Sequence, residues 1–273
     1  MQQRNKVLCV IVLYNTVITE SIAYSSLVQA GIDIFIVDNS PTYAAYQDIT
    51  YKNVVKYLHC PNNPGVSFAY NKAATFATEQ GYEWMLISDQ DTYLPSDIIA
   101  EFNKCIQQYP SIKLFCPKVF INNNRILSPV KSKYYLSKPS KNAPDGIIDL
   151  KNYSIINSGI IVNLEAFHEV GGYNEMVNLD FSDIQFIERF GAVYSNACVL
   201  DSSCIQSYSN EVQSQKQKLN RFKLFCQSLK HYEPIVYTNR LWLWIVVMKR
   251  TVSLCLQCRS LTPICIMFNN YLR

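Results

Sequence analysis

The chain has 273 residues, of which 49% are apolar, and its 25 Lys and Arg residues against 21 Asp and Glu give a net charge of +4. This length and composition allow one large domain, or a domain with an appendage, and exclude a collagen-like or low-complexity chain. Ten cysteines, whose spacing matches no metal framework, indicate reduced thiols in a cytosolic protein.

The first hundred residues alternate between strand and helix patterns. The predicted strands are 7–13, 32–37, 54–58 and 84–88, and the predicted helices are 17–30, 66–80 and a helix capped by Ser96 that ends near Gln108. The first apolar run is short and lacks a cleavage site, so we expect a core strand there and not a signal peptide. This alternation predicts an α/β fold with a mostly parallel sheet flanked by helices.

The pattern weakens beyond residue 111. Strands are predicted at 114–121, 155–162 and 193–200, and helices at 164–170 and 183–190. Between them, residues 122–146 are rich in asparagine, lysine and proline, which predicts a long surface loop over the functional site.

The end of the chain differs sharply in charge from the rest. Residues 1–215 carry 15 basic and 20 acidic side chains, whereas residues 216–273 carry 10 basic side chains and a single acid, Glu233. We therefore predict a catalytic domain at 1–215 and a basic, helical tail at 216–273.

The tail also contains an apolar run with two tryptophans at 241–248, followed by Lys249 and Arg250. Eight apolar residues are too few to span a bilayer, but a basic segment with Trp and Leu suits an anionic membrane surface. The alternative is a helix packed on the domain or on a second copy of the chain, so a homo-oligomer stays open.

Two aspartates, Asp89 and Asp91, directly follow the apolar run at 84–88. Carboxylates this close repel each other unless a cation or a donor-rich ligand lies between them. A hard divalent cation that also binds phosphate oxygens would suit this pair, so we expect a phosphorylated or nucleotide-linked substrate. The alternative is a solvated turn after a strand, where Asp is common.

Three further polar residues are candidates for the same site. Asp38 ends the second strand, where it either accepts a hydrogen bond from the ring N–H of uracil or thymine or caps a turn. Asn71 lies in the first turns of the helix at 66–80, whose backbone amides could approach a ribose or a phosphate. Asp183 begins a later helix, as a general base or as a simple helix cap.

Taken in order, these segments resemble the family 2 glycosyltransferases of the Rossmann-like GT-A fold. The resemblance is strongest to the bacterial rhamnosyltransferase-like group that builds surface polysaccharides, and it extends over about residues 7–205. The matching segments are 12–15 (Val-Leu-Tyr-Asn), 36–40 (Ile-Val-Asp-Asn-Ser), 63–71, 84–91, 157–159 (Asn-Ser-Gly), 171–175 (Gly-Gly-Tyr-Asn-Glu) and 180–189.

The resemblance implies a role for each candidate residue. Asp91 is expected to hold Mg²⁺ or Mn²⁺ on the diphosphate of the donor, and Asp183 matches the general base of inverting members. The donor-binding residues that it implies are Tyr14 and Asn15 beside the nucleotide, Asp38 at the pyrimidine base, Asn71, and Asp89.

Two positions depart from the pattern of the group. Gln185 stands where a glutamate is usual, two residues after the base, and the segment 204–208 lacks the histidine that usually follows the last core strand. These departures put the affinity for metal, or the need for metal, in question.

The sequence thus predicts an inverting glycosyltransferase on the cytoplasmic face of the inner membrane. It would move a sugar from a dTDP- or UDP-sugar to a lipid-linked saccharide of the O-antigen or capsule type, with no nucleic acid as a partner. Rhamnose is favoured, and galactose, glucose and galactofuranose stay open. The alternatives are a metal-dependent phosphohydrolase that uses Asp89 and Asp91, and a non-catalytic scaffold of a polysaccharide assembly complex.

Overall fold

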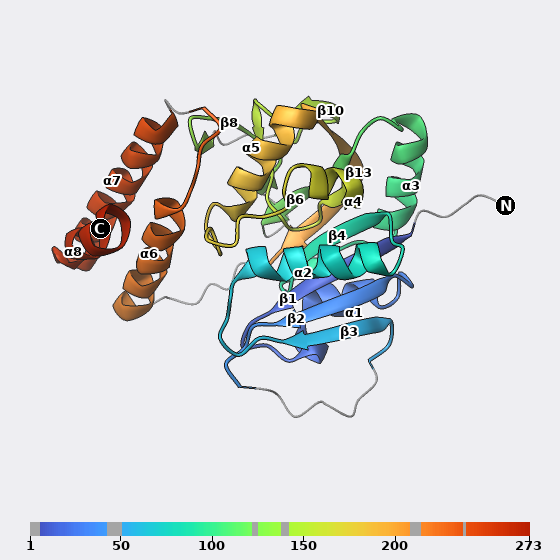
Figure 1. Cartoon of the computed structure of the whole chain (residues 1–273), viewed down its shortest axis with the longest axis horizontal. Coiled ribbons are helices and arrows are strands. Elements are labelled where there is room, and N and C mark those ends of the chain that lie inside the picture. Colours follow the sequence, from blue (N-terminus) through green and yellow to red (C-terminus); the bar gives the residue numbers. More distant parts are fainter. Residues whose placement is uncertain (1–5, 43–50, 122–124, 138–141, 208–213, 237–238) are drawn as a thin grey trace.

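A large sheet with helices on both faces forms the centre of the molecule, and three further helices lie at one end (Figure 1). The computed structural model describes residues 6–42, 51–121, 125–137, 142–207, 214–236 and 239–273.

The main path of the sheet has the strand order β10-β13-β6-β12-β4-β1-β2-β3. These strands are β1 (Val7–Leu13), β2 (Asp33–Asp38), β3 (Val54–His59), β4 (Trp84–Asp89), β6 (Leu114–Ile121), β10 (Gly146–Asp149), β12 (Ile161–Asn163) and β13 (Asn196–Gln206). All of them except β10 and β12 run in the same direction. Continuous apolar runs such as β1, buried along its whole length, are typical of strands covered on both faces. The predicted α/β fold with a mostly parallel sheet is confirmed.

Two layers of helices cover the sheet. Helices α2 (Val66–Glu79), α4 (Leu164–Glu169) and α5 (Ser182–Tyr194) pack on one face, and α1 (Ile22–Leu27) and α3 (Ile98–Gln108) pack on the other. Successive residues of each strand point to opposite faces, so β1 contributes to two separate cores.

Two of the helices begin later than predicted. A short 3-10 turn, Ile18–Glu20, precedes α1, and the Ser21 side chain then caps α1 by accepting a hydrogen bond from the Tyr24 N–H at 3.2 Å. Asp97, and not Ser96, holds the N-cap position of α3, and its side chain makes no capping hydrogen bond.

The predicted loop at 122–146 is largely wrong. Residues 122–124 and 138–141 lie outside the described residues, but most of the remainder forms short strands: β7 (Arg125–Ser128), β8 (Val130–Lys133), β9 (Leu136–Ser137) and the start of β10. β7 pairs with β6, while β8 forms a small second sheet with β9 and with β11 (Tyr153–Ser154). These strands have only two to four residues and mix polar with apolar side chains, so they lack the apolar run that predicts a buried strand.

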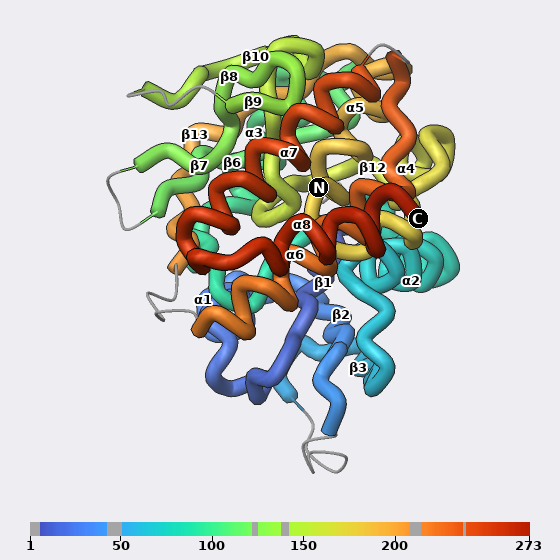
Figure 2. Tube along the Cα trace, turned by 90° about the vertical axis from the view of Figure 1, so that its left-hand side faces the viewer, coloured from blue at the N-terminus to red at the C-terminus, as the bar shows by residue number. Residues whose placement is uncertain are grey.

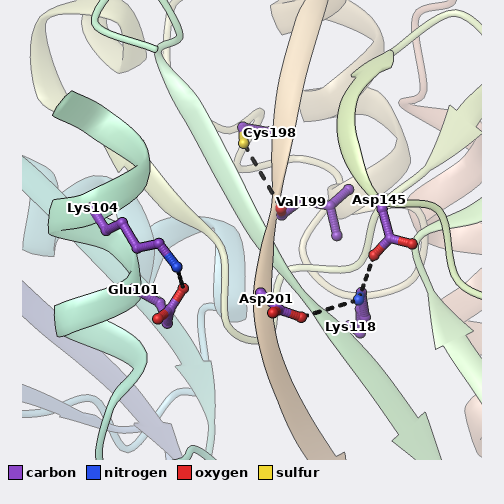
Figure 3. Close-up of polar contacts among 7 residues, drawn as sticks. All are labelled: Glu101, Lys104, Lys118, Asp145, Cys198, Val199 and Asp201. Atoms are coloured by element: carbon purple, nitrogen blue, oxygen red, sulfur yellow. Dashed lines mark hydrogen bonds and ion pairs between the residues drawn. The ribbon is translucent and has the colours of Figure 1, made fainter. Parts of the chain in front are cut away.

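Lys118 on β6 links three segments in the part of the sheet that contains β10, β13 and β6 (Figure 3). Its ammonium on β6 lies 2.5 Å from Asp145, just before β10, and 3.5 Å from Asp201 on β13. The hydrogen bond with Asp145 is the main reason why the pKa of Lys118 is raised. Both carboxylates are mostly exposed, so these ion pairs contribute little to the free energy of unfolding.

The C-terminal helices are α6 (Gln215–Lys230), α7 (Asn239–Cys258) and α8 (Thr262–Met267), followed by a π-helical turn at Phe268–Leu272. They lie beside the sheet in Figure 1 and cross the face turned to the viewer in Figure 2. Their side chains form a third core, which includes Phe222, Phe225, Leu243 and Val247. The domain boundary at 215 stays a prediction.

Helix α7 is longer than the predicted apolar run of eight residues. It has 20 residues, and among the helices of the described ranges it alone is long and apolar enough to cross a membrane, by length and composition only. Only 22% of its most apolar stretch is buried.

Candidate functional site

The carboxyl ends of three neighbouring strands meet at one edge of the sheet. The register pairs Leu13 of β1 with Asp38 of β2, and Val12 of β1 with Asp89 of β4. The residues that follow β1, β2 and β4 therefore lie together, at the edge where open α/β sheets bind ligands.

Asp38 lines a cavity of about 420 Å³ together with Asn15 and Tyr57. Its side chain is buried, and both of its oxygens accept hydrogen bonds, Oδ1 from the Ser40 N–H at 2.9 Å and Oδ2 from the Tyr57 hydroxyl at 2.7 Å. A carboxylate oxygen can accept a second hydrogen bond. The predicted contact with a pyrimidine ring stays a prediction.

Backbone hydrogen bonds fix the segment after β1. The Tyr14 N–H donates to Gln90 Oε1 at 2.8 Å, and the Asn15 N–H donates to Ser40 Oγ at 2.8 Å. Asn15 has a φ of 52°, in the left-handed region that asparagine tolerates better than most residues. The Tyr14 side chain is 49% exposed, so its ring is free to contact a ligand over the site.

Asp89 and Asp91 share one neighbour, Gln206, at the end of β13. The Gln206 amide Nε2 lies 3.4 Å from Asp89 Oδ2 and 3.5 Å from Asp91 Oδ1. Asp89 also accepts a hydrogen bond from the Tyr70 hydroxyl at 3.4 Å. The backbone N–H of Asp89 donates to Ser158 Oγ at 2.9 Å, which anchors the end of β4.

The two carboxylates are held where their charged forms are disfavoured. Burial, followed by the charge of Asp91, raises the pKa of Asp89 to about 6, although hydrogen bonds from Tyr70, Ser158 and Gln206 oppose the shift. Burial also raises the pKa of Asp91. A cation beside the pair would favour their ionised forms.

Asp183 lies in the first turn of α5, and its Oδ1 accepts a hydrogen bond from the Ile184 N–H at 2.8 Å. Burial raises the pKa of Asp183 to about 7, and the charges of Asp180 and Asp89 add to this effect. The residue before the helix, Phe181, has a φ of 68°, an unfavourable backbone conformation for an aromatic residue. Such strained residues cluster at functional sites.

Two buried tyrosines connect the start of α5 with the end of β4. The rings of Tyr70 and Tyr173 lie 5.0 Å apart between centroids, and the charges of both Asp89 and Asp183 contribute to raising their pKa values after burial. The Tyr173 hydroxyl donates to Asn157 Oδ1 at 2.6 Å. The structure therefore brings Asp183 near the Asp89 and Asp91 pair, although 92 residues separate Asp91 from Asp183 in the sequence.

Asn71 serves as a clamp between two segments of the protein. Its Nδ2 donates to the Tyr173 carbonyl and to Glu175 Oε1, each at 2.9 Å, and its Oδ1 accepts from the Tyr173 N–H at 2.8 Å. A Cβ on Gly172 would lie only 2.7 Å from Asn71 Oδ1, so the clamp also requires glycine there. These contacts occupy both hydrogens of the amide, and the donor-binding role of Asn71 stays a prediction.

Gln185, the first of the two departures, is buried on α5. Its Nε2 donates to the Glu233 carbonyl at 3.5 Å, and its Oε1 has no partner among the described residues. The residue therefore connects α5 to the segment before α7.

A second cavity, of about 440 Å³, lies against α5. Parts of three segments line it with residues of the helix itself: 132–135, 150–154 and 235–239, of which 237–238 lie outside the described residues. It contains three tyrosines, Tyr134, Tyr135 and Tyr153, and two apolar residues of α5, Ile184 and Ile187.

The residues around Asp91 fit a hard divalent cation. The described ranges contain no group of three or more His, Cys, Asp or Glu side chains able to hold a metal ion. However, Asp89, Asp91 and Gln206 together offer carboxylate and amide oxygens, the ligand type that Mg²⁺ and Mn²⁺ prefer. Gln206 belongs to the segment 204–208, where the resemblance led us to expect a histidine, but the sequence did not single out Gln206 itself as a neighbour of Asp89.

Residues 9–171 match the family described as Glycosyl transferase family 2. Among curated proteins, the chain is 25% identical over 194 residues to dTDP-rhamnosyl transferase RfbF of Shigella flexneri. This match covers 68% of the chain and 63% of the length of that protein, so the chain spans less than two thirds of this relative.

Among solved structures, the chain is similar to residues 1–349 of TarS from S. aureus in complex with UDP. The TM-score is 0.55 at 16% identity, and the match covers 87% of this chain and 69% of that one. A longer TarS structure matches with a TM-score of 0.53 at 15% identity, over 91% of this chain and 44% of that one. At these identities the likeness shows the fold, which is GT-A.

Proposed function

Because the chain belongs to glycosyl transferase family 2, we propose that it is an inverting glycosyltransferase that uses a pyrimidine nucleotide-sugar. One observation carries the proposal: Asp183, whose burial raises its pKa to about 7, lies near the Asp89 and Asp91 pair at the ligand-binding edge of the sheet. A carboxylate with a pKa near the working pH is well suited to general base catalysis. The same observation favours sugar transfer over phosphate ester hydrolysis, because a phosphohydrolase that uses Asp89 and Asp91 would leave Asp183 without a role.

In the proposed reaction, Asp183 accepts the proton of an acceptor hydroxyl. The oxygen of that hydroxyl then forms a bond to the anomeric carbon of the donor sugar, while the bond from this carbon to the diphosphate oxygen breaks. Attack from the side opposite the leaving nucleotide inverts the configuration. Asp89 and Asp91 would hold Mg²⁺ or Mn²⁺, which supplies positive charge to the leaving diphosphate.

The donor is proposed to lie across the three strand ends. The cavity beside Asp38 has room for the base, Asn15 lines this cavity, and the exposed side chain of Tyr14 directly precedes Asn15 in the chain. TarS was solved with UDP, and RfbF is described as a dTDP-rhamnosyl transferase, so both names favour a pyrimidine nucleotide. The likeness to RfbF favours rhamnose over galactose, glucose or galactofuranose.

The acceptor is proposed to enter through the second cavity, which Ile184, the residue after Asp183, helps to line. Its three tyrosines offer apolar ring faces with a hydroxyl, a surface that suits the stacking of sugar rings. We infer that the acceptor is a lipid-linked saccharide, because the same cavity is bordered by Ile235 and Val236 and by Asn239, the first residue of the apolar helix α7.

We further propose that the protein binds the cytoplasmic face of the inner membrane through a surface of α7, α8 and the final turn. Its exposed apolar residues, here named the α7–α8 surface, are Leu241, Trp244, Ile245, Val252, Leu256, Leu261, Ile264, Phe268 and Leu272. Lys249 on α7 and Arg259, directly after α7, are also exposed, and Glu233 is the last acid of the chain. Apolar and cationic side chains together suit an anionic lipid surface.

The catalytic proposal is tested with purified protein, Mn²⁺, a panel of dTDP- and UDP-sugars and lipid-linked acceptors. Asp183→Asn should lower turnover by about 10²- to 10⁴-fold, because it removes the base, and leave the Kd of the nucleotide almost unchanged. Asp91→Ala should weaken both turnover and nucleotide binding.

Asp201→Asn, which changes an exposed aspartate on β13, is the control and should keep full activity. Full turnover by both site variants would disprove the mechanism, and nucleotide-sugar binding without transfer to any acceptor would favour the scaffold.

A further inference from the structure

Gln206 is held in the site by its backbone. It is the last residue of β13, and it pairs with Thr92 in the antiparallel contact between β13 and β5 (Thr92–Tyr93). The next residue continues the contact, since the Ser207 N–H donates to the Asp91 carbonyl at 3.1 Å. The position of the Gln206 main chain beside Asp91 therefore does not depend on the hydrogen bonds that the side-chain amide makes.

The two ends of the Gln206 amide have different surroundings. Its Nε2 faces Asp89 Oδ2 at 3.4 Å and Asp91 Oδ1 at 3.5 Å, so one hydrogen of the NH₂ group can point to each carboxylate. Its Oε1 is buried and has no hydrogen-bond partner among the described residues. A buried polar atom without a partner is costly, and most proteins leave few of them.

Rotation of the amide by half a turn would exchange these two ends, because the oxygen and the nitrogen of a glutamine amide have nearly the same shape. Without a cation, the NH₂ group is favoured beside the two carboxylates, since an oxygen there would be repelled. With a cation between the carboxylates, the preference reverses, because the oxygen is attracted to the cation and the NH₂ group is not.

We propose that Gln206 is a third ligand of the divalent cation, and that its amide turns its oxygen to the cation when the cation binds. In the metal-free protein, the same amide bridges Asp89 and Asp91 and relieves their repulsion. The inference rests on the proposed function for the occupant of the site.

The test measures the binding of Mn²⁺ to the full chain at pH 8 in the presence of UDP, by the loss of the free Mn²⁺ signal in electron paramagnetic resonance. Gln206→Asn keeps the amide but shortens its reach, so it should raise the Kd of Mn²⁺ by about tenfold. Gln206→Glu keeps both the reach and an oxygen, so it should bind Mn²⁺ at least as tightly as the wild type. Gln107→Asn, at an exposed position of α3, is the matched control and should not change the Kd.

The direction in which Gln206→Asn changes the Kd of Mn²⁺ distinguishes a metal ligand from a bridge between the carboxylates. If Gln206 only bridges the carboxylates through its NH₂ group, Gln206→Asn removes a competitor and Mn²⁺ binds as tightly as before or more tightly, which would overturn the inference. In that case, nucleotide-sugar turnover by the wild type would still support the proposed function. Failure of the wild type to bind any Mn²⁺ would overturn both the inference and the metal-dependent mechanism. Circular dichroism of each variant confirms that the fold is kept.

Discussion

At the scale of single residues, the ionisation of Asp183 sets the expected pH dependence of the reaction. Burial, helped by the charges of Asp180 and Asp89, raises its pKa to about 7, and only the ionised form can accept a proton. We expect kcat/KM to rise about tenfold per pH unit below pH 7 and to level off above it. Stopped-time assays from pH 5.5 to 8.5 measure this profile.

Asp180→Asn provides the control for this assignment. It removes one of the charges that raise the pKa of Asp183, so the inflection should move to lower pH while the maximal rate stays similar. A flat profile between pH 5.5 and 8.5 would be inconsistent with Asp183 as the base.

Some residues of the site were predictable from the sequence, and others were not. Asp38, Asp89 and Asp91 come at or just after the end of an apolar run, so the neighbouring residues alone predicted their position at strand ends. Gln206 lies 115 residues after Asp91, and only the pairing of β13 with β5 brings the two together. For Asn71, the sequence suggested a contact with a ligand, whereas in the structure its side-chain amide makes hydrogen bonds to Tyr173 and Glu175.

At the scale of elements, the start of α2 depends on close packing against residue 178. Gly65 has a φ of 95°, and a Cβ there would lie 2.3 Å from the Asn178 carbonyl oxygen, which also accepts the Val66 N–H at 2.8 Å. Gly65→Ala should therefore lower the free energy of unfolding by about 3 kcal/mol or more, from backbone strain plus the clash. Urea unfolding measures the change.

Gly81→Ala is the matched control for Gly65→Ala. Gly81, just after α2, has a φ of 73°, but a Cβ there would meet nothing within 4 Å. Its cost should be about 1–2 kcal/mol, the backbone term alone. Equal losses for the two variants would mean that the contact with Asn178 does not constrain α2.

The length and the apolar pattern of each element decide whether the sequence could predict it. β1 has the predicted bounds because it is a continuous apolar run bounded by polar residues. β6 also has the predicted bounds, although Pro117 and Lys118 interrupt its apolar run. The strands within 125–137 were missed because they are short, and pairing with distant partners forms them. β13 extends to Gln206, beyond the predicted 193–200, because β6 and β5 supply hydrogen-bond partners for its polar second half.

At the scale of the whole molecule, α7 is apolar on nearly all sides. Leu243, Val247 and Leu254 face the third core, while Leu241, Trp244 and Leu256 are exposed. A helix with apolar residues all round is usually buried in protein or in lipid. We propose that the exposed apolar residues of α7 contact the membrane surface.

The α7–α8 surface makes membrane binding testable with vesicles that contain anionic lipid. The double variant Leu256→Glu with Leu261→Glu removes two side chains that are 74% and 71% exposed, so it should reduce vesicle binding at least tenfold without lowering the melting temperature. Sedimentation with vesicles at low and high salt measures the effect, and high salt should weaken wild-type binding.

Ile147→Glu, at an exposed apolar position of β10, is the control for this experiment and should bind vesicles like the wild type. If the double variant instead turns a dimer into a monomer in light scattering, and the wild type ignores vesicles, the surface is an interface between two copies of the chain.

Val177 belongs to the third core together with Phe222 and Leu243, while its carbonyl accepts a hydrogen bond from Ser67 at the start of α2. The loop that carries it leads directly into Phe181 and Asp183. A version of the protein cut before α6 would leave this loop without its support, so shortening the chain to improve solubility should impair sugar transfer even in an assay that needs no lipid.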